Sequence, residues 1–139
     1  NIKELSGNEL NEYTNLEYFG LNSSPLEKIP GNLFEHNPKL KYISINDNRV
    51  KSIGSNLFDN IQVDGLKYLS FYQNECIDSY SSQKDTIKEI IQQVRVICEE
   101  VPEETIEETL KNLKNDIEAL KLMNKQLITK IDNAFGTSE

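Results

Sequence analysis

Few residues of this 139-residue chain have the types and spacing that catalysis requires. His36 is the only histidine, and it stands in no serine–histidine–acid set and in no cysteine–histidine pattern typical of a metal site. The sequence also lacks a glycine-rich phosphate-binding loop, and the glutamates between residues 99 and 108 fit a solvated helix start. We therefore predict that the protein is not an enzyme and uses neither a cofactor nor a metal ion.

Cys76 and Cys98 are the only two cysteines, and their chemistry has two interpretations. A disulfide between them would close a loop of roughly 23 residues and would stabilise the fold by about 3 kcal/mol. It would also indicate an oxidising compartment. Alternatively, both are buried free thiols of a protein from a reducing compartment. The spacing alone leaves both interpretations open.

Tyrosines recur at one position of three similar segments, as Tyr18, Tyr42 and Tyr68, and Tyr72 follows the third. If each segment is a strand with its apolar neighbours turned inward, the tyrosines face outward in one strip. Tyrosine offers a large, rigid contact area with a polar tip, which suits protein recognition. The predicted ligand-binding face consists of these four tyrosines with Ser44 and Asn46. The alternative is that the rings only shield one another and stabilise the sheet.

Asn22-Ser23-Ser24 matches the acceptor sequence for N-glycosylation. A glycan on Asn22 would cover part of the predicted binding face. Three-residue matches also arise by chance, so the alternative is an ordinary polar turn.

The elements that position these residues come from a repeated sequence. The segment from Leu16 to Phe34 returns 24 residues later as Leu40 to Phe58, with apolar residues at the same places, and a third copy begins near Leu66 at an offset of 26. Such a period is typical of stacked repeats. Alternation predicts short parallel strands with Phe19, Leu21, Ile43 and Ile45 on the inner face.

Other residues of the repeat are predicted to hold neighbouring turns together. Asn48 and Asn74 should bond backbone groups through their amides, with Ser24 as a shorter substitute. Phe34 and Phe58 should stack on each other. Residues 77–85 are expected to be a loop, and a helix near residues 84–98, capped by Asp85, should cover the exposed edge of the last strand. The apolar face of that helix is predicted to contain Ile87, Ile90, Ile91, Val94 and Ile97.

The repeated pattern L-x-x-L-x-L-x-x-N-x-L-x-x-I-P-x-x-L-F resembles the extracellular leucine-rich repeat family. The resemblance implies an α/β solenoid, a leucine-rich-repeat horseshoe fragment with a helical C-terminal cap. It divides the chain into repeats at 1–76, expected to end a longer array, a cap at 77–100, and a helix at 101–135. It further implies a disulfide between Cys76 and Cys98 within the cap, and therefore a secreted protein.

The last helix has the seven-residue periodicity of a coiled coil over four heptads. Asn124 occupies one central position, where asparagine specifies register and strand number. We predict association, with the same or a different chain, and the alternative is a helix that folds back on the repeats. The predicted interface contains Leu110, Leu113, Ile117, Leu120, Asn124, Leu127 and Ile131.

The net charge of −8 argues against nucleic acid and anionic membranes as partners, and no stretch is apolar enough to span a bilayer. These observations predict a secreted, dimeric, protein-binding module. Repeats, cysteine cap and coil together are similar in layout to leucine-rich-repeat immune proteins of insects, which implies a role in innate immunity. The alternative is a matrix or adhesion protein in which the repeats are a scaffold and the coil drives assembly.

Overall fold

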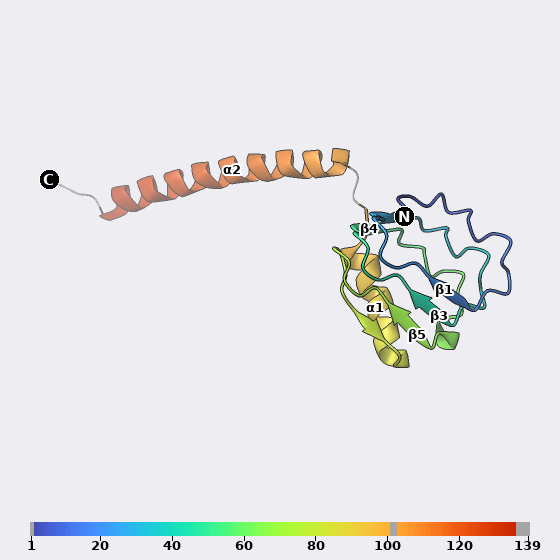
Figure 1. The fold of residues 1–139 in the computed structure, drawn as a ribbon. Coiled ribbons are helices and arrows are strands. Elements are labelled where there is room, and N and C mark those ends of the chain that lie inside the picture. The colour runs from blue at the N-terminus through green and yellow to red at the C-terminus, as the bar shows by residue number, and fades with distance from the viewer. Residues whose placement is uncertain (1, 101–102, 136–139) are drawn as a thin grey trace. The chain divides into compact units, whose positions relative to one another are not determined.

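Three short parallel strands, one from each repeated segment, lie side by side in the computed structural model, which describes residues 2–100 and 103–135. They are β1 (Tyr18–Gly20), β3 (Tyr42–Ser44) and β5 (Tyr68–Ser70), coloured from blue to green in Figure 1. The register pairs Tyr18 with Tyr42 and Tyr42 with Tyr68. The predicted strand positions and their parallel pairing are therefore confirmed.

A second, smaller sheet forms where each repeated segment turns back. It pairs β2 (Lys28–Ile29) with β4 (Ser52–Ile53) in parallel. The two extra residues of the third segment fall near a short 3-10 helix, η1 (Val63–Gly65). The offset of 26 in place of 24 is thus accommodated at a helical turn.

The far edge of β5 is closed by another strand, which corrects two predictions. β6 (Tyr80–Ser81) pairs antiparallel with β5, so residues 77–85 are not simply a loop. α1 (Lys84–Ile97) packs against β6, and it is therefore β6, not the helix, that covers the edge of β5. The residue before α1 is Gln83, which makes no side-chain capping bond, so the predicted Asp85 cap is also wrong.

The sheet topology overturns the predicted fold class. A horseshoe needs an all-parallel sheet whose curvature accumulates over many repeats. Here three strands of three residues are followed by an antiparallel strand, giving a mixed sheet of order β1-β3-β5-β6. The structure is a mixed sheet of short strands with two helices, and the α/β solenoid, or leucine-rich-repeat horseshoe fragment, is wrong as its description.

The core lies between the two sheets and α1. It includes Leu26, Ile43, Leu69 and Ile90, each at most 2% exposed. The predicted stack of Phe34 on Phe58 is wrong. Phe34 meets the ring of Phe19 edge-on at 5.3 Å, and Phe58 meets Phe71 edge-on at 6.2 Å.

One residue of the predicted helix face also differs. Ile97 is 59% exposed, whereas Cys98 is fully buried beside Val94 and the other apolar residues of α1. Cys98, four residues after Val94, continues the buried face of α1, whereas Ile97 lies at the margin of that face and is wrong as a member of it.

The chain divides into two compact units, Asn1–Glu100 and Val101–Glu139. The first holds both sheets and α1. Within the second, α2 (Glu103–Phe135) is one continuous helix of 33 residues. The predicted long C-terminal helix is confirmed over Glu103–Phe135.

Candidate functional site

The three paired tyrosines stand on one side of the sheet, because the residues between them point into the core. Phe19, Ile43 and Leu69 are the inward neighbours, and the latter two are fully buried. The rings of Tyr18 and Tyr42 stack in parallel, with centroids 4.4 Å apart and planes 1° apart. Tyr18 is 64% exposed, while Tyr42 and Tyr68 are half-buried. We refer to Tyr18, Tyr42 and Tyr68 as the tyrosine strip.

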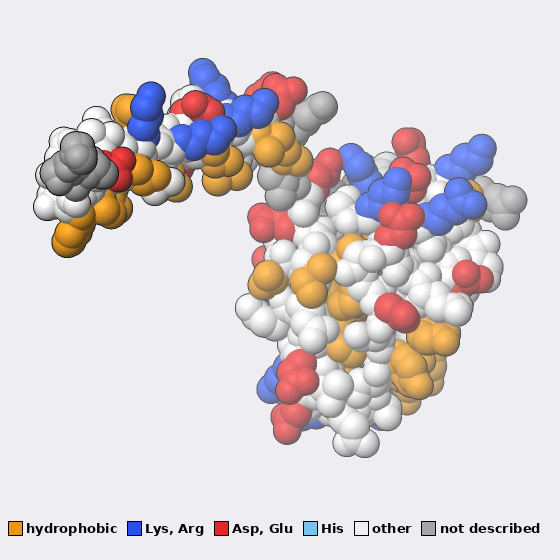
Figure 2. All heavy atoms as spheres, turned by 90° about the vertical axis from the view of Figure 1, so that its left-hand side faces the viewer, with side chains coloured by type: hydrophobic (Ala, Val, Ile, Leu, Met, Phe, Trp, Pro, Cys, Tyr) orange, Lys and Arg blue, Asp and Glu red, His pale blue; other side chains and the backbone are white. Residues whose placement is uncertain are grey.

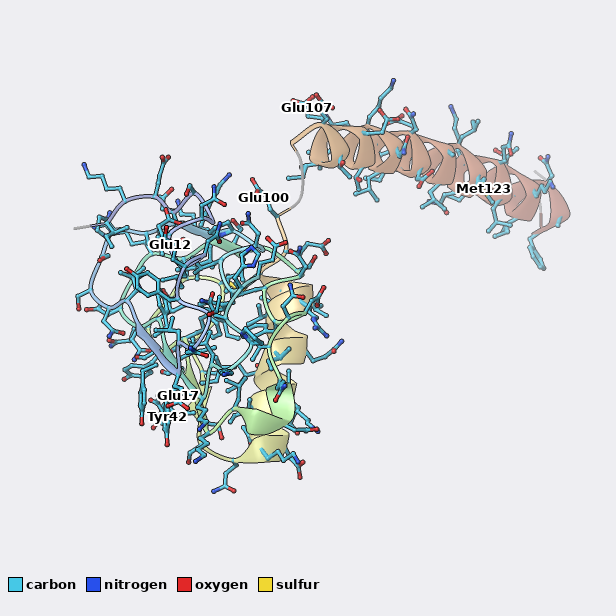
Figure 3. The ribbon with its side chains drawn as sticks, turned by 90° about the vertical axis from the view of Figure 1, so that its right-hand side faces the viewer. Glu12, Glu17, Tyr42, Glu100, Glu107 and Met123 are labelled. Atoms are coloured by element: carbon cyan, nitrogen blue, oxygen red, sulfur yellow. A yellow bond between two sulfur atoms is a disulfide. The ribbon has the colours of Figure 1, made fainter. Side chains whose placement is uncertain are left out.

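An ion pair borders the tyrosine strip. Lys41 Nζ lies 2.9 Å from Glu17 Oε1, and Figure 3 shows Glu17 beside Tyr42 at one edge of this unit. The hydrogen bond from Lys41 lowers the pKa of the Glu17 carboxyl and raises the pKa of Lys41. Partial desolvation and the neighbouring Tyr42 raise the pKa of Tyr18. Next to the strip lies the Glu17–Lys41 ion pair, and Lys39 and Lys67 are close enough to lower the pKa of Glu17 further.

The polar residues beside the strip bond mainly to one another. Ser70 Oγ donates to Asn46 Oδ1 at 2.6 Å, and Asn46 Nδ2 donates to Ser44 Oγ at 2.9 Å. Ser44 Oγ donates in turn to Asn22 Oδ1 at 3.1 Å, and Asn22 Oδ1 also accepts from the Asn46 backbone at 2.9 Å. Ser70 is fully buried, and Asn46 and Ser44 are half-buried. Ser44 and Asn46 therefore fix the surface that carries the tyrosines, and they keep little hydrogen-bonding capacity for a ligand.

A second aromatic pair was not predicted from the sequence. Tyr72 and Tyr80 meet edge-on with centroids 5.7 Å apart, and both are exposed. They line an open hollow of about 330 Å³ together with Asp78 and Glu89. The sequence does not predict a strand at Tyr80, because β6 is two residues long and lies in a serine-rich stretch without alternation of apolar and polar residues.

The turn after each strand is built alike in all three segments. Ser23, Asp47 and Gln73 have φ values of 55°, 53° and 58°, in the left-handed region that reverses the chain. The predicted amide bonds are present next to the second and third turns: Asn48 Nδ2 donates to the carbonyls of Leu21 and Asn46, both at 3.0 Å, and Asn74 Nδ2 donates to those of Ile45 and Phe71. At the first turn, Ser24 contributes its backbone N–H to Asn48 Oδ1 instead.

Cys76 and Cys98 form a disulfide, with Cα atoms 5.3 Å apart. The Cys98 carbonyl also accepts a hydrogen bond of 2.7 Å from Ile53 N at β4. A covalent bond and a backbone bond thus tie the end of α1 to two different segments. The alternative of two free thiols is excluded.

The predicted association residues all lie on α2 with exposed side chains, including Leu110, Leu120 and Asn124. Figure 2 shows hydrophobic side chains gathered along one side of α2, with lysines on another. The other members of the predicted interface are Leu113, Ile117, Leu127 and Ile131, and they are exposed to a similar extent.

The remaining predicted features are placed without being brought together into a site. His36 and Asn22 are exposed. Among residues 2–100 and 103–135, no group of three or more His, Cys, Asp or Glu side chains is arranged to hold a metal ion. Neither of the helices in the described ranges combines the length and apolarity needed to cross a bilayer.

Comparison with protein-family models, with curated proteins and with solved structures finds no match to this chain. The function of this chain is therefore inferred from the geometry of each of its two units.

Proposed function

We propose that this protein is a secreted binding module that recognises a protein ligand on the face formed by the tyrosine strip and the Tyr72–Tyr80 pair. The observation that carries the proposal is the exposed aromatic surface on a rigid sheet. Four tyrosines in the strands of one sheet, with Tyr72 just after β5, give contact area that costs little entropy on binding, because each ring has few rotatable bonds and several are held by their neighbours.

The charges favour a protein over other partners. The strip is bordered by the Glu17–Lys41 ion pair, with Lys39 and Lys67 close enough to lower the pKa of Glu17, and the hollow at Tyr72 and Tyr80 carries Asp78 and Glu89. Nucleic acid and anionic membranes would require clustered lysine and arginine without these carboxylates. A polypeptide with apolar side chains and charges of both signs is complementary to this face.

An extracellular location is part of the proposal. A disulfide that ties down the end of a core helix persists in oxidising compartments and is rare in reducing ones. The repeated sequence pattern, independently of the fold, supports relationship to the extracellular leucine-rich repeat family. The layout of repeats, cysteine pair and long helix supports a role in innate immunity. Glycosylation of Asn22 stays a prediction.

The second part of the proposal is association through α2. A helix of 33 residues whose apolar side chains are all exposed gains its stability from a partner, because an isolated helix is only marginally stable in water. The alternative function, a matrix or adhesion protein, uses the same association but no ligand on the tyrosine face.

The test is a pull-down from extracellular fluid with the whole chain. We expect Tyr18→Ala combined with Tyr72→Ala to reduce ligand capture at least tenfold, about 1.4 kcal/mol, because exposed tyrosines at an interface centre are frequent hot spots. Both rings are exposed, so their removal spares the core. The matched control is Tyr13→Ala, an exposed tyrosine outside the sheet.

The captured protein is then purified and its affinity measured for all three forms. Equal affinity of the double variant and the control would show that the tyrosine face does not bind the captured protein. The matrix or adhesion role would then be the better account.

A further inference from the structure

We propose that the partner of α2 is a second copy of this chain, and that the two helices form a parallel, in-register, two-stranded coiled coil. The inference rests on the association part of the proposed function and names its partner. It is argued from the order of residues around the helix.

The apolar seam of α2 has the composition of a two-stranded coil. With Leu110 at the first heptad position, a, the a positions continue as Ile117, Asn124 and Ile131. The fourth position, d, is occupied mainly by leucine. Isoleucine at a with leucine at d favours two parallel strands over three or four. All these side chains are exposed along the helix, and a 33-residue helix extends for about 50 Å.

Asn124 distinguishes the possible registers. In a parallel, in-register pair, Asn124 of one copy lies opposite Asn124 of the other, and the two amides can bond to each other. In the antiparallel arrangement that keeps all four heptads paired, Asn124 lies opposite Leu113. An amide buried against leucine has lost water without gaining a partner, which is costly. The amide therefore favours the parallel arrangement.

The residues that flank the seam favour the same arrangement. In the parallel pair, Asp116 at position g lies across from Lys121 at position e of the second copy, and the pair occurs twice by symmetry. Met123 lies across from Ile128, which extends the apolar contact. Both pairs make the helix complementary to itself.

The antiparallel pair with full overlap lacks this complementarity. It places Lys114 of one copy beside Lys121 of the other, again twice, so two like-charge contacts replace two ion pairs. In the parallel pair, Lys114 lies across from Thr109 and Lys130 from Phe135, so no like charges meet at the flanking positions. The charge pattern thus selects both the orientation and the identity of the partner.

The first experiment uses cysteine trapping in the whole chain. Leu110→Cys and Leu127→Cys are made separately, and one of them carries a size tag. In a parallel pair each variant forms a disulfide-linked dimer with itself, because equivalent seam residues adjoin. In the fully overlapped antiparallel pair, residue 110 lies opposite residue 127, and two copies of residue 110 are about 25 Å apart. Cross-links would then form only on mixing.

The second experiment measures affinity by sedimentation at micromolar concentration. We expect a dimer for the wild type, and we expect Asp116→Lys to raise the dimer Kd about threefold to tenfold, because two ion pairs become repulsive. The double change Asp116→Lys with Lys121→Asp restores opposite charges across the interface and should bring the Kd back toward the wild-type value. Because Lys121→Asp also removes the 3.4 Å ion pair of Lys121 with Glu118 in its own helix, that single variant is measured as the control. A Kd of the double variant below those of both single variants assigns the effect to the ion pair between the two copies.

Three results would overturn the proposal: a chain that stays monomeric alone, a trimer or tetramer, or cross-links that form only on mixing. None of these results affects ligand capture by the tyrosine face. Failure here and failure of the proposed binding function are therefore distinguishable.

Discussion

At the scale of single residues, the asparagines after the strands do most to hold neighbouring turns together. Asn48 is nearly buried, donates to two carbonyls, and accepts a bond of 2.9 Å from the backbone N–H of Ser24. Asn74 makes the corresponding bonds to the carbonyls of Ile45 and Phe71, at 2.7 and 2.9 Å. Each amide therefore bonds main-chain groups of its own segment and of the segment before it.

Asn48→Ala should lower the free energy of unfolding by about 2 kcal/mol, because it removes the partner of the Ser24 N–H and the amide bonds to the carbonyls of Leu21 and Asn46 in a partly buried turn. Urea unfolding of the whole chain, followed by tyrosine fluorescence, measures the change. Asn60→Ala is the control, because Asn60 is exposed and its loss should change the midpoint little. Equal midpoints for the two variants would show that the Asn48 amide adds nothing to stability.

The inward or outward direction of the side chains in each strand could be predicted from the repeat, because the apolar residues must face the core. Phe19, Ile43 and Leu69 are paired between neighbouring strands although their spacings along the chain are 24 and 26 residues, because each must point into the core. The tyrosines between them were assigned to the outer face by the same alternation. The hydrogen bonds among Ser70, Asn46 and Ser44 could not be predicted, because small polar side chains have several rotamers and the sequence does not determine which one is adopted.

At the scale of elements, periodicity predicted α1 and α2 but not β6. A helix of 14 or 33 residues repeats its apolar pattern several times, whereas a two-residue strand has no period. β6 forms because the edge of β5 offers unpaired backbone groups, which is a property of the assembled sheet. The solenoid prediction is wrong for the same reason, because the repeated segments predict only parallel strands and β6 adds an antiparallel one.

The exposure of Ile97 has a physical cause in the end of α1. Cys98 is held by its disulfide to Cys76 and by the bond from Ile53 N to its carbonyl, so the chain end is fixed by two anchors. Cys98 lies four residues after Val94 and seven after Ile91, so the helical period places it on the buried face and leaves Ile97 at the margin of that face. The two anchors hold Cys98 in this position, and Ile97 stays exposed to solvent.

Removing the disulfide should destabilise the first unit by about 3 kcal/mol, the value expected for a loop of this length. The change is Cys76→Ala with Cys98→Ala, since alanine avoids placing a polar group at the buried Cys98 position. Urea unfolding with and without reductant measures the effect. Reductant should destabilise the wild type but leave the double variant unchanged. A wild type insensitive to full reduction would contradict the structural role of this bond.

At the scale of the whole molecule, the two units can be followed separately because their chromophores differ. All six tyrosines lie between Tyr13 and Tyr80, in the first unit, and the chain has no tryptophan. Most helical residues belong to α2, which has 33 against 14 in α1. Tyrosine fluorescence therefore reports the sheet unit, and the far-ultraviolet helix signal reports mainly α2.

Heating the whole chain should give two transitions with different dependence on protein concentration. If α2 is stabilised by a second copy, its melting temperature rises with concentration by mass action, whereas the tyrosine transition of a unit that folds within one chain does not move. Circular dichroism and fluorescence over a hundredfold range of concentration measure both. Asp116→Lys should lower the helix transition alone. Coincident transitions with one shared concentration dependence would mean that the sheet unit and α2 unfold together, and the separation into two independently stable units would be wrong.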